Sequence, residues 1–118
     1  MQIVIKSTGL ELNDSLRTYI NNKFSSIEKM AKSFEANGEL ILKVEIARTT
    51  KHHNKGNVFY VECSLPIGSK LLRIEQTDED MHAAIDIAQG RLKEEVEQFK
   101  EKAMGKDRKS IDKLKQKD

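Results

Sequence analysis

Residues 77–86 read Thr-Asp-Glu-Asp-Met-His-Ala-Ala-Ile-Asp, and they join two different hydrophobic patterns. Before them, residues 70–77 alternate between apolar and polar side chains, as a half-buried strand does. After them, apolar residues recur every three or four positions, as on one face of a helix. The carboxylates between the two patterns suit a helix start, where they cap backbone N–H groups and oppose the helix dipole. The junction therefore predicts a strand followed directly by a helix, with Thr77 or Asp78 as the N-cap.

The helix after the junction is predicted over residues 80–104. Its apolar stripe consists of Met81, Ile85, Ala88, Leu92, Val96, Phe99 and Ala103. Gly90 lies inside it at a cost of about 1 kcal/mol relative to Ala, and Gly105 is a natural stop. We therefore expect one domain over residues 1–104. Residues 105–118 are expected to form a basic tail that is disordered or at most weakly helical.

Four further elements are predicted upstream of the junction. Residues 2–7 are rich in β-branched side chains and indicate a strand. Asn13 is a good N-cap for a helix whose apolar stripe is Leu16, Ile20, Phe24, Ile27, Ala31 and Phe34. Residues 40–48 and 58–65 alternate as strands, and the short turns favour an antiparallel meander. The order β-α-β-β-β-α predicts a two-layer α+β domain, with two helices on one face of a four-stranded sheet.

The sheet face away from the helices is expected to be polar. It would carry Lys43, Glu45, Tyr60, Glu62, Arg73 and Glu75. Cys63 alternates with apolar residues and is expected in the core, because a catalytic thiol needs an electropositive, partly exposed site. A single cysteine excludes an intramolecular disulfide and fits a reducing compartment. No apolar run approaches the roughly 20 residues that cross a membrane, so a cytoplasmic location is expected.

The distribution of charge points toward a polyanionic partner. The chain has 21 Lys and Arg against 19 Asp and Glu, a net charge of +2. Residues 102–118 hold seven of the basic and three of the acidic residues, so the tail is basic and the remainder slightly acidic. A basic tail favours binding to nucleic acid or another polyanion. A solvated tail that only aids solubility explains the charge equally well, and both interpretations stay open.

Signals for catalysis are weak. There is no Gly-rich phosphate loop, no nucleophile elbow and no His-Glu-x-x-His zinc motif. The carboxylates near the junction are Asp78, Glu79, Asp80 and Asp86, and their spacing suits capping better than acid–base chemistry. We expect no enzyme, no metal, no cofactor and no small-molecule substrate. The alternative is a small metal-dependent enzyme that uses His52, His53 and the acidic cluster.

Basic residues give the better functional signal. Arg48, Lys51, His52, His53 and Lys55 lie in or beside one polar loop; Lys29 and Lys32 lie on the exposed side of the first helix; Arg91, Lys93, Lys100 and Lys102 lie on that of the last. Lys and Arg spaced in this way can follow phosphates, and structured RNA is read largely by shape. The alternative is a solvated, salt-bridged surface, because four glutamates interleave with the bases of the last helix.

Residues 48–59 read Arg-Thr-Thr-Lys-His-His-Asn-Lys-Gly-Asn-Val-Phe, and residues 72–75 read Leu-Arg-Ile-Glu. Together with the junction at residues 77–86, these stretches resemble the ribosome hibernation promoting factors. Residues 80–86 are similar to the family's Asp-Met-Tyr-Ala-Ala-Ile-Asp, with His82 where the family often has Tyr. The resemblance covers about residues 1–104. The family's fold is β-α-β-β-β-α, similar to double-stranded RNA-binding domains, and it agrees with the order of elements predicted above.

The resemblance implies a ribosome hibernation factor of the short form, without the extra C-terminal domain that mediates ribosome dimerisation. Such a protein binds the decoding region of the small ribosomal subunit, blocks messenger and transfer RNA, and inhibits translation under stress or in stationary phase. A helper protein in ribosome dimerisation would be a further partner, and no membrane is involved. The resemblance implies that ribosomal RNA is contacted by Lys29, Lys32, Arg48, Lys51, His52, His53, Lys55, Arg73, Arg91, Lys93, Lys100 and Lys102. The alternative is a general structured-RNA-binding module without ribosome specificity.

Overall fold

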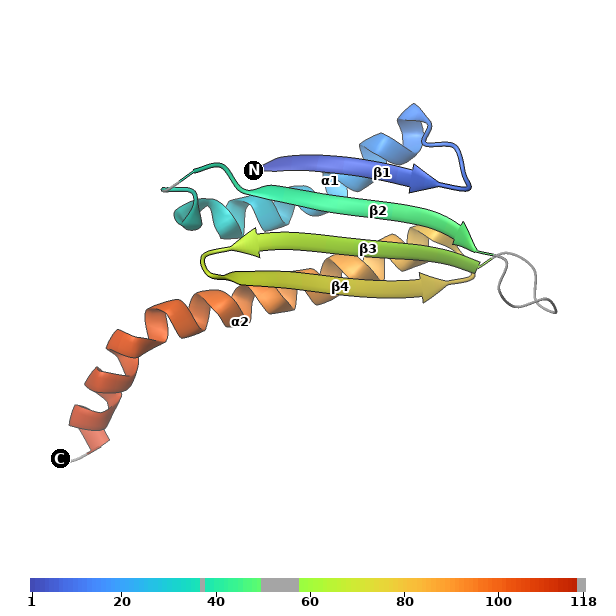
Figure 1. The fold of residues 1–118 in the computed structure, drawn as a ribbon. Helices are drawn as coiled ribbons and strands as arrows, with labels where there is room; N and C mark the ends of the chain where they lie inside the picture. The colour runs from blue at the N-terminus through green and yellow to red at the C-terminus, as the bar shows by residue number, and fades with distance from the viewer. Residues whose placement is uncertain (37, 50–57, 117–118) are drawn as a thin grey trace.

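The computed structural model describes residues 1–36, 38–49 and 58–116, with side chains through residue 103. The elements are β1 (Gln2–Thr8), α1 (Asp14–Ala31), a short 3₁₀ helix η1 (Lys32–Phe34), β2 (Ile41–Thr49), β3 (Val58–Ile67), β4 (Lys70–Asp78) and α2 (Met81–Gln116). Apart from the one-turn η1, this is the predicted order β-α-β-β-β-α, which is therefore confirmed (Figure 1).

The four strands form one mixed sheet in the order β1-β2-β3-β4. β2, β3 and β4 pair antiparallel, which confirms the predicted meander. β1 pairs parallel to β2, with Gln2 beside Ile41 and Thr8 beside Ala47. Parallel pairing needs a long crossover between the two strands, and α1 supplies it. β1 and β4 are consequently the two edges of the sheet (Figure 1).

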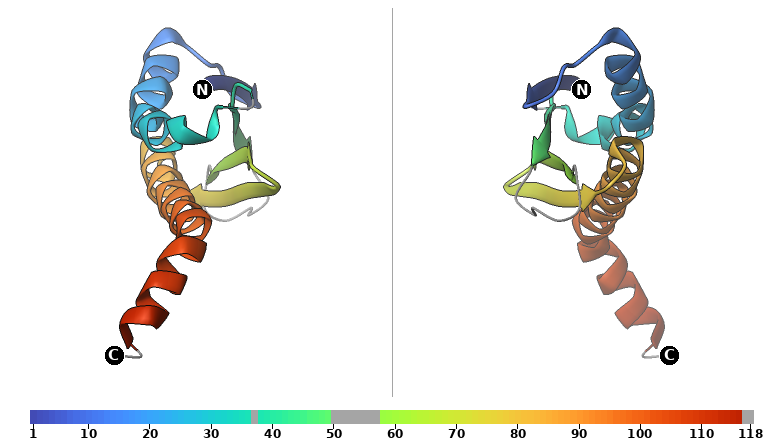
Figure 2. Two further views of the ribbon diagram at one scale, coloured as in Figure 1. Left: turned by 90° about the vertical axis from the view of Figure 1, so that its left-hand side faces the viewer. Right: turned by 90° about the vertical axis from the view of Figure 1, so that its right-hand side faces the viewer.

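Both helices cover the same face of the sheet, as predicted. Figure 2 shows α1 over the β1 side and α2 over the β4 side. The buried core takes Leu16, Ile20, Phe24, Ile27 and Ala31 from α1, Leu42, Val44 and Ile46 from β2, Val61, Cys63, Leu65 and Ile67 from β3, Leu72 and Ile74 from β4, and Met81, Ala84, Ile85, Ala88, Leu92 and Val96 from α2. Burying one such large side chain contributes about 1.5–3 kcal/mol. No polar or charged side chain is buried among the residues described.

Cys63 lies fully inside this core. Burial, with a smaller contribution from the charge of Glu62, raises the pKa of its thiol to about 12. A thiol that does not ionise at neutral pH is neither a nucleophile nor a metal ligand. The prediction that Cys63 is a core residue is confirmed.

The helix start at the junction differs from the prediction. Asp80 is the N-cap of α2, because its Oδ2 accepts a hydrogen bond of 3.1 Å from the backbone N–H of Ala83. Asp78 instead ends β4 opposite Phe59 and accepts a hydrogen bond of 2.9 Å from the N–H of Asp80. The predicted caps, Thr77 and Asp78, are therefore wrong, since strand pairing holds both residues in the sheet.

The other end of α2 also differs from the prediction. The helix continues through Gly105 to Gln116, so Gly105 is not the stop that was expected. Its neighbours Ala103, Met104 and Lys106 are strong helix formers, which offset the roughly 1 kcal/mol that one glycine costs. Figure 1 shows the last turns of α2 projecting beyond the sheet. The domain limit at residue 104 stays a prediction.

In the described part of the chain, no helix is both long enough and apolar enough to cross a bilayer.

The hairpin between β3 and β4 contacts the middle of α2 through Gly68. Gly68 has a φ of 58°, in the left-handed region that only glycine enters readily. A Cβ built on Gly68 would lie 2.9 Å from Cζ of Phe99, so the ring packs directly on this turn. Phe99 also meets the ring of Phe34 edge-on, with centroids 5.1 Å apart. Gly68 therefore permits both the tight turn and the close approach of α2.

Replacing Gly68 by alanine is expected to lower the free energy of unfolding by about 1–2 kcal/mol, because it strains the turn and displaces Phe99. Gly90→Ala is the matched control. Gly90 lies inside α2 with open space where the methyl group of an alanine would point, and the same change there should stabilise by about 0.5–1 kcal/mol. Urea unfolding of both variants measures the difference, and equal effects would contradict this account of Gly68.

Candidate nucleic-acid interface

The two helices meet through a polar seam. The side-chain Oδ1 of Asp86 on α2 accepts a hydrogen bond of 2.5 Å from the hydroxyl of Tyr19 and lies 3.2 Å from Nζ of Lys23, both on α1. One turn further on, the amide of Gln89 donates to the hydroxyl of Ser26 at 2.9 Å. Ser26 follows Lys23 along α1, and its partner Gln89 follows Asp86 along α2. The two helices therefore run in the same direction. They lie together as one layer on one side of the sheet (Figure 2).

Asp86 is the centre of the seam and is not part of the helix cap. Although burial opposes it, hydrogen bonds from Tyr19 and Lys23 hold the pKa of the Asp86 carboxyl below its ordinary value of 3.8. The same hydrogen bond raises the pKa of the Tyr19 hydroxyl to about 12. His82 packs edge-on against Tyr19, with ring centroids 4.5 Å apart. His82, Tyr19, Lys23 and Asp86 thus form one cluster that the sequence pattern did not reveal.

Lysines lie on the solvent side of this helix layer. The predicted contact residues here are Lys29, Lys32, Lys93, Lys100 and Lys102. All are exposed except Lys100, which is half-exposed, and among the described residues none has an ion-pair partner. Lys93 and Lys100 follow Asp86 at steps of seven residues, so they share the flank of α2 that faces α1. The structure therefore places these lysines along the helix surface with their charges available.

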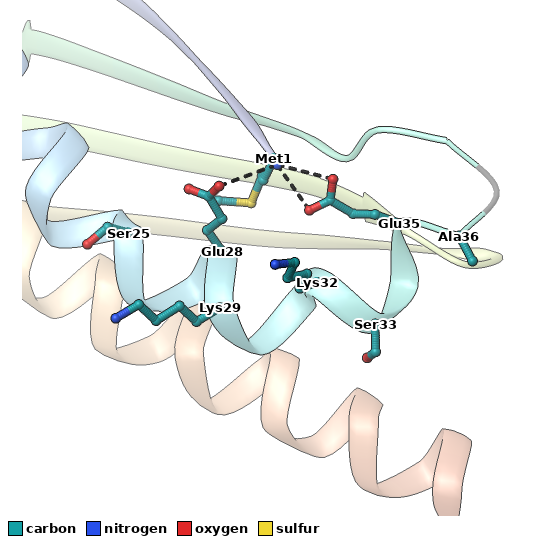
Figure 3. Close-up of a pocket in the computed structure, with 8 residues that line it drawn as sticks. All are labelled: Met1, Ser25, Glu28, Lys29, Lys32, Ser33, Glu35 and Ala36. Carbon is teal, nitrogen blue, oxygen red and sulfur yellow. Dashed lines mark hydrogen bonds and ion pairs between the residues drawn. The ribbon is translucent and has the colours of Figure 1, made fainter.

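The far end of α1 is less basic than its lysines alone indicate. Figure 3 shows the N-terminal amine of Met1 between the carboxylates of Glu35 and Glu28. Its distances to Glu35 are 3.0 and 3.2 Å, and its distance to Glu28 is 3.7 Å. A surface hollow of about 680 Å³ beside them is lined in part by Lys29 and Lys32. The two glutamates lower the local positive potential, more for Lys32 than for the lysines on α2.

Arg73 does not belong to the helix surface. The alternation of β4 points it to the open face of the sheet, because its neighbours Leu72 and Ile74 face the core. There its guanidinium lies 3.1 Å from Glu62 and 2.7 Å from Glu75. The prediction that Arg73 lies on the polar, open face of the sheet is confirmed, and its charge is largely balanced there.

Two other candidates have contacts within the protein. Arg91 donates hydrogen bonds from Nη1 to the backbone carbonyl of Glu75 at 2.7 Å and to Oε1 of Gln76 at 2.9 Å, which fastens α2 to the free edge of β4. Arg48 lies at the end of β2 with its guanidinium 5.8 Å from the ring centroid of Phe59. The remaining loop candidates, Lys51, His52, His53 and Lys55, lie outside the described residues.

The described residues offer little for catalysis. Within residues 1–36, 38–49 and 58–103, no three His, Cys, Asp or Glu side chains are grouped so that they could hold a metal ion. The junction carboxylates Asp78 and Asp80 are engaged with backbone N–H groups. The exposed lysines of the helix surface have no role in packing the core, so this surface is the candidate site.

Comparison with known proteins identifies the family. The family model described as Sigma 54 modulation protein / S30EA ribosomal protein matches residues 3–104. The chain belongs to this family. The resemblance on residues 48–59, 72–75 and 80–86 is thereby confirmed, and so is the fold it implied.

Individual relatives agree with the family. The chain is 28% identical over 107 residues to a ribosome hibernation promotion factor of Lactococcus lactis, which covers 91% of this chain and 54% of the relative. The chain spans about half the length of the curated relatives it matches. The N-terminal domain of Thermus thermophilus Protein Y superposes with a TM-score of 0.67 at 29% identity, covering 84% of this chain and 99% of that domain. A ribosomal subunit interface protein from Coxiella burnetii, 14% identical, has the same fold with a TM-score of 0.66, covering 85% of this chain and 98% of that one.

Replacing Tyr19 by phenylalanine is expected to lower the free energy of unfolding at pH 7 by about 1 kcal/mol, because it removes a hydrogen bond to a half-exposed carboxylate. The pKa of Asp86 is depressed in the folded protein, so its stabilisation is present above 3.8 and is lost as the pH falls through the folded value. The cost of Tyr19→Phe should therefore shrink toward pH 3.

Urea unfolding between pH 7 and pH 3 measures this cost. Asp86→Asn serves as the control background, in which Tyr19→Phe should cost clearly less at pH 7. A cost that is the same at every pH and in both backgrounds would show that the hydroxyl of Tyr19 contributes independently of the Asp86 carboxylate.

Proposed function

We propose that this protein is a ribosome hibernation factor that binds the small ribosomal subunit and inhibits translation under stress or in stationary phase. The names of its relatives support a ribosomal partner, since they include a ribosome hibernation promotion factor and a ribosomal subunit interface protein. The protein acts by binding, with no catalytic step. A cytoplasmic location follows from the proposed partner.

The distribution of charge over the two faces carries this proposal. On the helix surface, Lys29, Lys93 and Lys100 have no ion-pair partner among the described residues, so they are available to phosphates. On the open face of the sheet, Lys6 is paired with Glu45, and Arg73 is paired with Glu62 and Glu75, so these two bases offer little free positive charge to a phosphate backbone. RNA is therefore expected against the helix layer, with the sheet facing away from it.

The mechanism is steric. The helix surface binds the phosphate backbone of the ribosomal RNA at the decoding region, where the bound protein occupies the paths of messenger and transfer RNA. Two parallel helices held at a fixed spacing by the Asp86 seam present their lysines as a rigid array. A rigid array favours RNA of matching shape over an arbitrary duplex, because structured RNA is recognised by its shape and phosphates.

Reversing the charge of both Lys93 and Lys100 to glutamate is expected to weaken ribosome binding by about tenfold or more at moderate salt, because two phosphate contacts are lost. The dependence of binding on salt should become shallower by about one unit of log–log slope for each contact removed. Sedimentation of ribosomes through sucrose gradients, with each protein at two salt concentrations, measures both effects and identifies the bound particle.

Lys43→Glu is the matched control, since Lys43 is an exposed lysine on the open face of the sheet. It should leave binding nearly unchanged. Equal losses for the control and the double variant would reject the helix surface as the binding site. Equal affinity for ribosomes and for an arbitrary RNA duplex would replace the proposal by a general RNA-binding module.

A further inference from the structure

We infer that the free edge of β1 is an interface through which two copies of this protein associate. The backbone N–H of Gln2 donates to the carbonyl of Leu40, one residue before its partner Ile41. In a parallel ladder this means that even-numbered residues of β1 bond to β2, and that the N–H and C=O groups of Ile3, Ile5 and Ser7 point outward. β1 therefore presents a seven-residue edge able to pair with another strand.

The side chains along this edge give little protection against pairing. Natural edges are blunted by charged side chains, proline or bulges, and the β1 sequence Gln-Ile-Val-Ile-Lys-Ser-Thr has one such feature, the exposed Lys6. Val4 is 42% exposed on the open face, and Ile3 and Ile5 are only half-buried on the helix face. By contrast, the edge of β4 is partly covered, because Arg91 and Gln76 bond to its carbonyls at Glu75 and Thr77.

An antiparallel pairing of β1 with a second β1 is self-complementary when its two-fold axis passes beside Val4. Ile3 of one copy then exchanges backbone hydrogen bonds with Ile5 of the other, which uses the outward-pointing groups. Val4 faces Val4 of the second copy at a non-hydrogen-bonded position, where side chains approach most closely. Lys6 lies opposite the uncharged Gln2, so no like charges meet across the pair.

The helix above β1 supplies charge complementarity for the same arrangement. On α1, Tyr19, Lys23 and Ser26 come directly before buried positions and face α2. Arg17 and Glu28 come directly after buried positions and lie on the opposite flank, the one toward the β1 edge. Arg17 is exposed and has no ion-pair partner among the described residues.

Arg17 and Glu28 lie on opposite sides of the proposed two-fold axis, at similar distances from it along β1. Glu28 lies level with Met1, 3.7 Å from its amine (Figure 3). Arg17 is eleven residues earlier, about 16 Å back along the helix at 1.5 Å per residue. That distance equals about five strand residues, which puts Arg17 level with Lys6. A two-fold axis beside Val4 exchanges this level with that of Gln2, one strand residue from the level of Met1 and Glu28, so Arg17 of each copy comes close to Glu28 of the other.

The association is expected to be weak and sensitive to salt. Two short strand edges and one flank of a helix fall below the roughly 1,600 Å² that stable complexes bury. Exposed ion pairs add little to affinity and are screened by salt. The expected species is a reversible dimer that forms at high protein concentration and low ionic strength.

Sedimentation equilibrium of the full chain over a concentration series at low salt tests the inference. Arg17→Glu and Glu28→Arg should each weaken dimerisation by about tenfold, because like charges then face each other across the axis. The double variant should recover an association constant within about threefold of the unaltered protein, since the pairs are restored with opposite sense. Recovery in the double variant separates a contact between copies from any loss of folding in the single variants.

Val4→Lys tests the strand pairing itself, because it places two lysines beside the axis and should abolish the dimer. Thr8→Lys is the matched control on the same face of β1, beyond the paired residues, and should leave dimerisation unchanged. An unaltered protein that stays monomeric at the highest concentration overturns the inference. So does a double variant that associates no better than the single ones.

Discussion

The arrangement of this protein depends on one contact, the packing of two helical apolar stripes on one face of a four-stranded sheet. Every second residue of β2, β3 and β4 enters that contact, and none of the core side chains described is polar. Because the pleat alternates, burying one set of side chains fixes the other set on the open face. The way the core is built therefore places the glutamates that pair with Lys6 and Arg73 on the sheet, and on the helices several lysines that have no ion-pair partner among the described residues.

The seam at Asp86 adds a second constraint. Packing alone leaves two parallel helices free to shift by small amounts, since apolar contacts are not directional. Hydrogen bonds from Tyr19 and Lys23 to one carboxylate are directional, and they set the register of α2 against α1. The spacing of the lysines along the helix surface follows from this register, so the Asp86 seam also bears on the proposed contact with RNA.

Local patterns in the sequence predicted the fold well, because alternation and the helical repeat report directly on burial. The N-cap of α2 was missed because pairing of β4 with β3 extends through Asp78, a long-range effect that capping rules do not contain. The position of Arg73 follows from the alternation of β4, but its balance by Glu62 from β3 needs the strand register. The Asp86 seam was also missed, because it joins residues 67 positions apart, and only the spacing of Tyr19 and Lys23 hinted at a shared flank. The roles of the individual bases in binding RNA remain predictions.

The burial of Cys63 has a practical consequence. A thiol reacts with alkylating reagents only as the exposed thiolate, and the folded protein holds Cys63 both covered and protonated. Alkylation of Cys63 can occur only while the sheet and helices are separated. Its rate therefore depends on how often they separate. With one cysteine in the chain, the signal has a single origin. The alkylation rate of Cys63 therefore reports how often the core opens transiently, in the intact chain and in the presence of any partner.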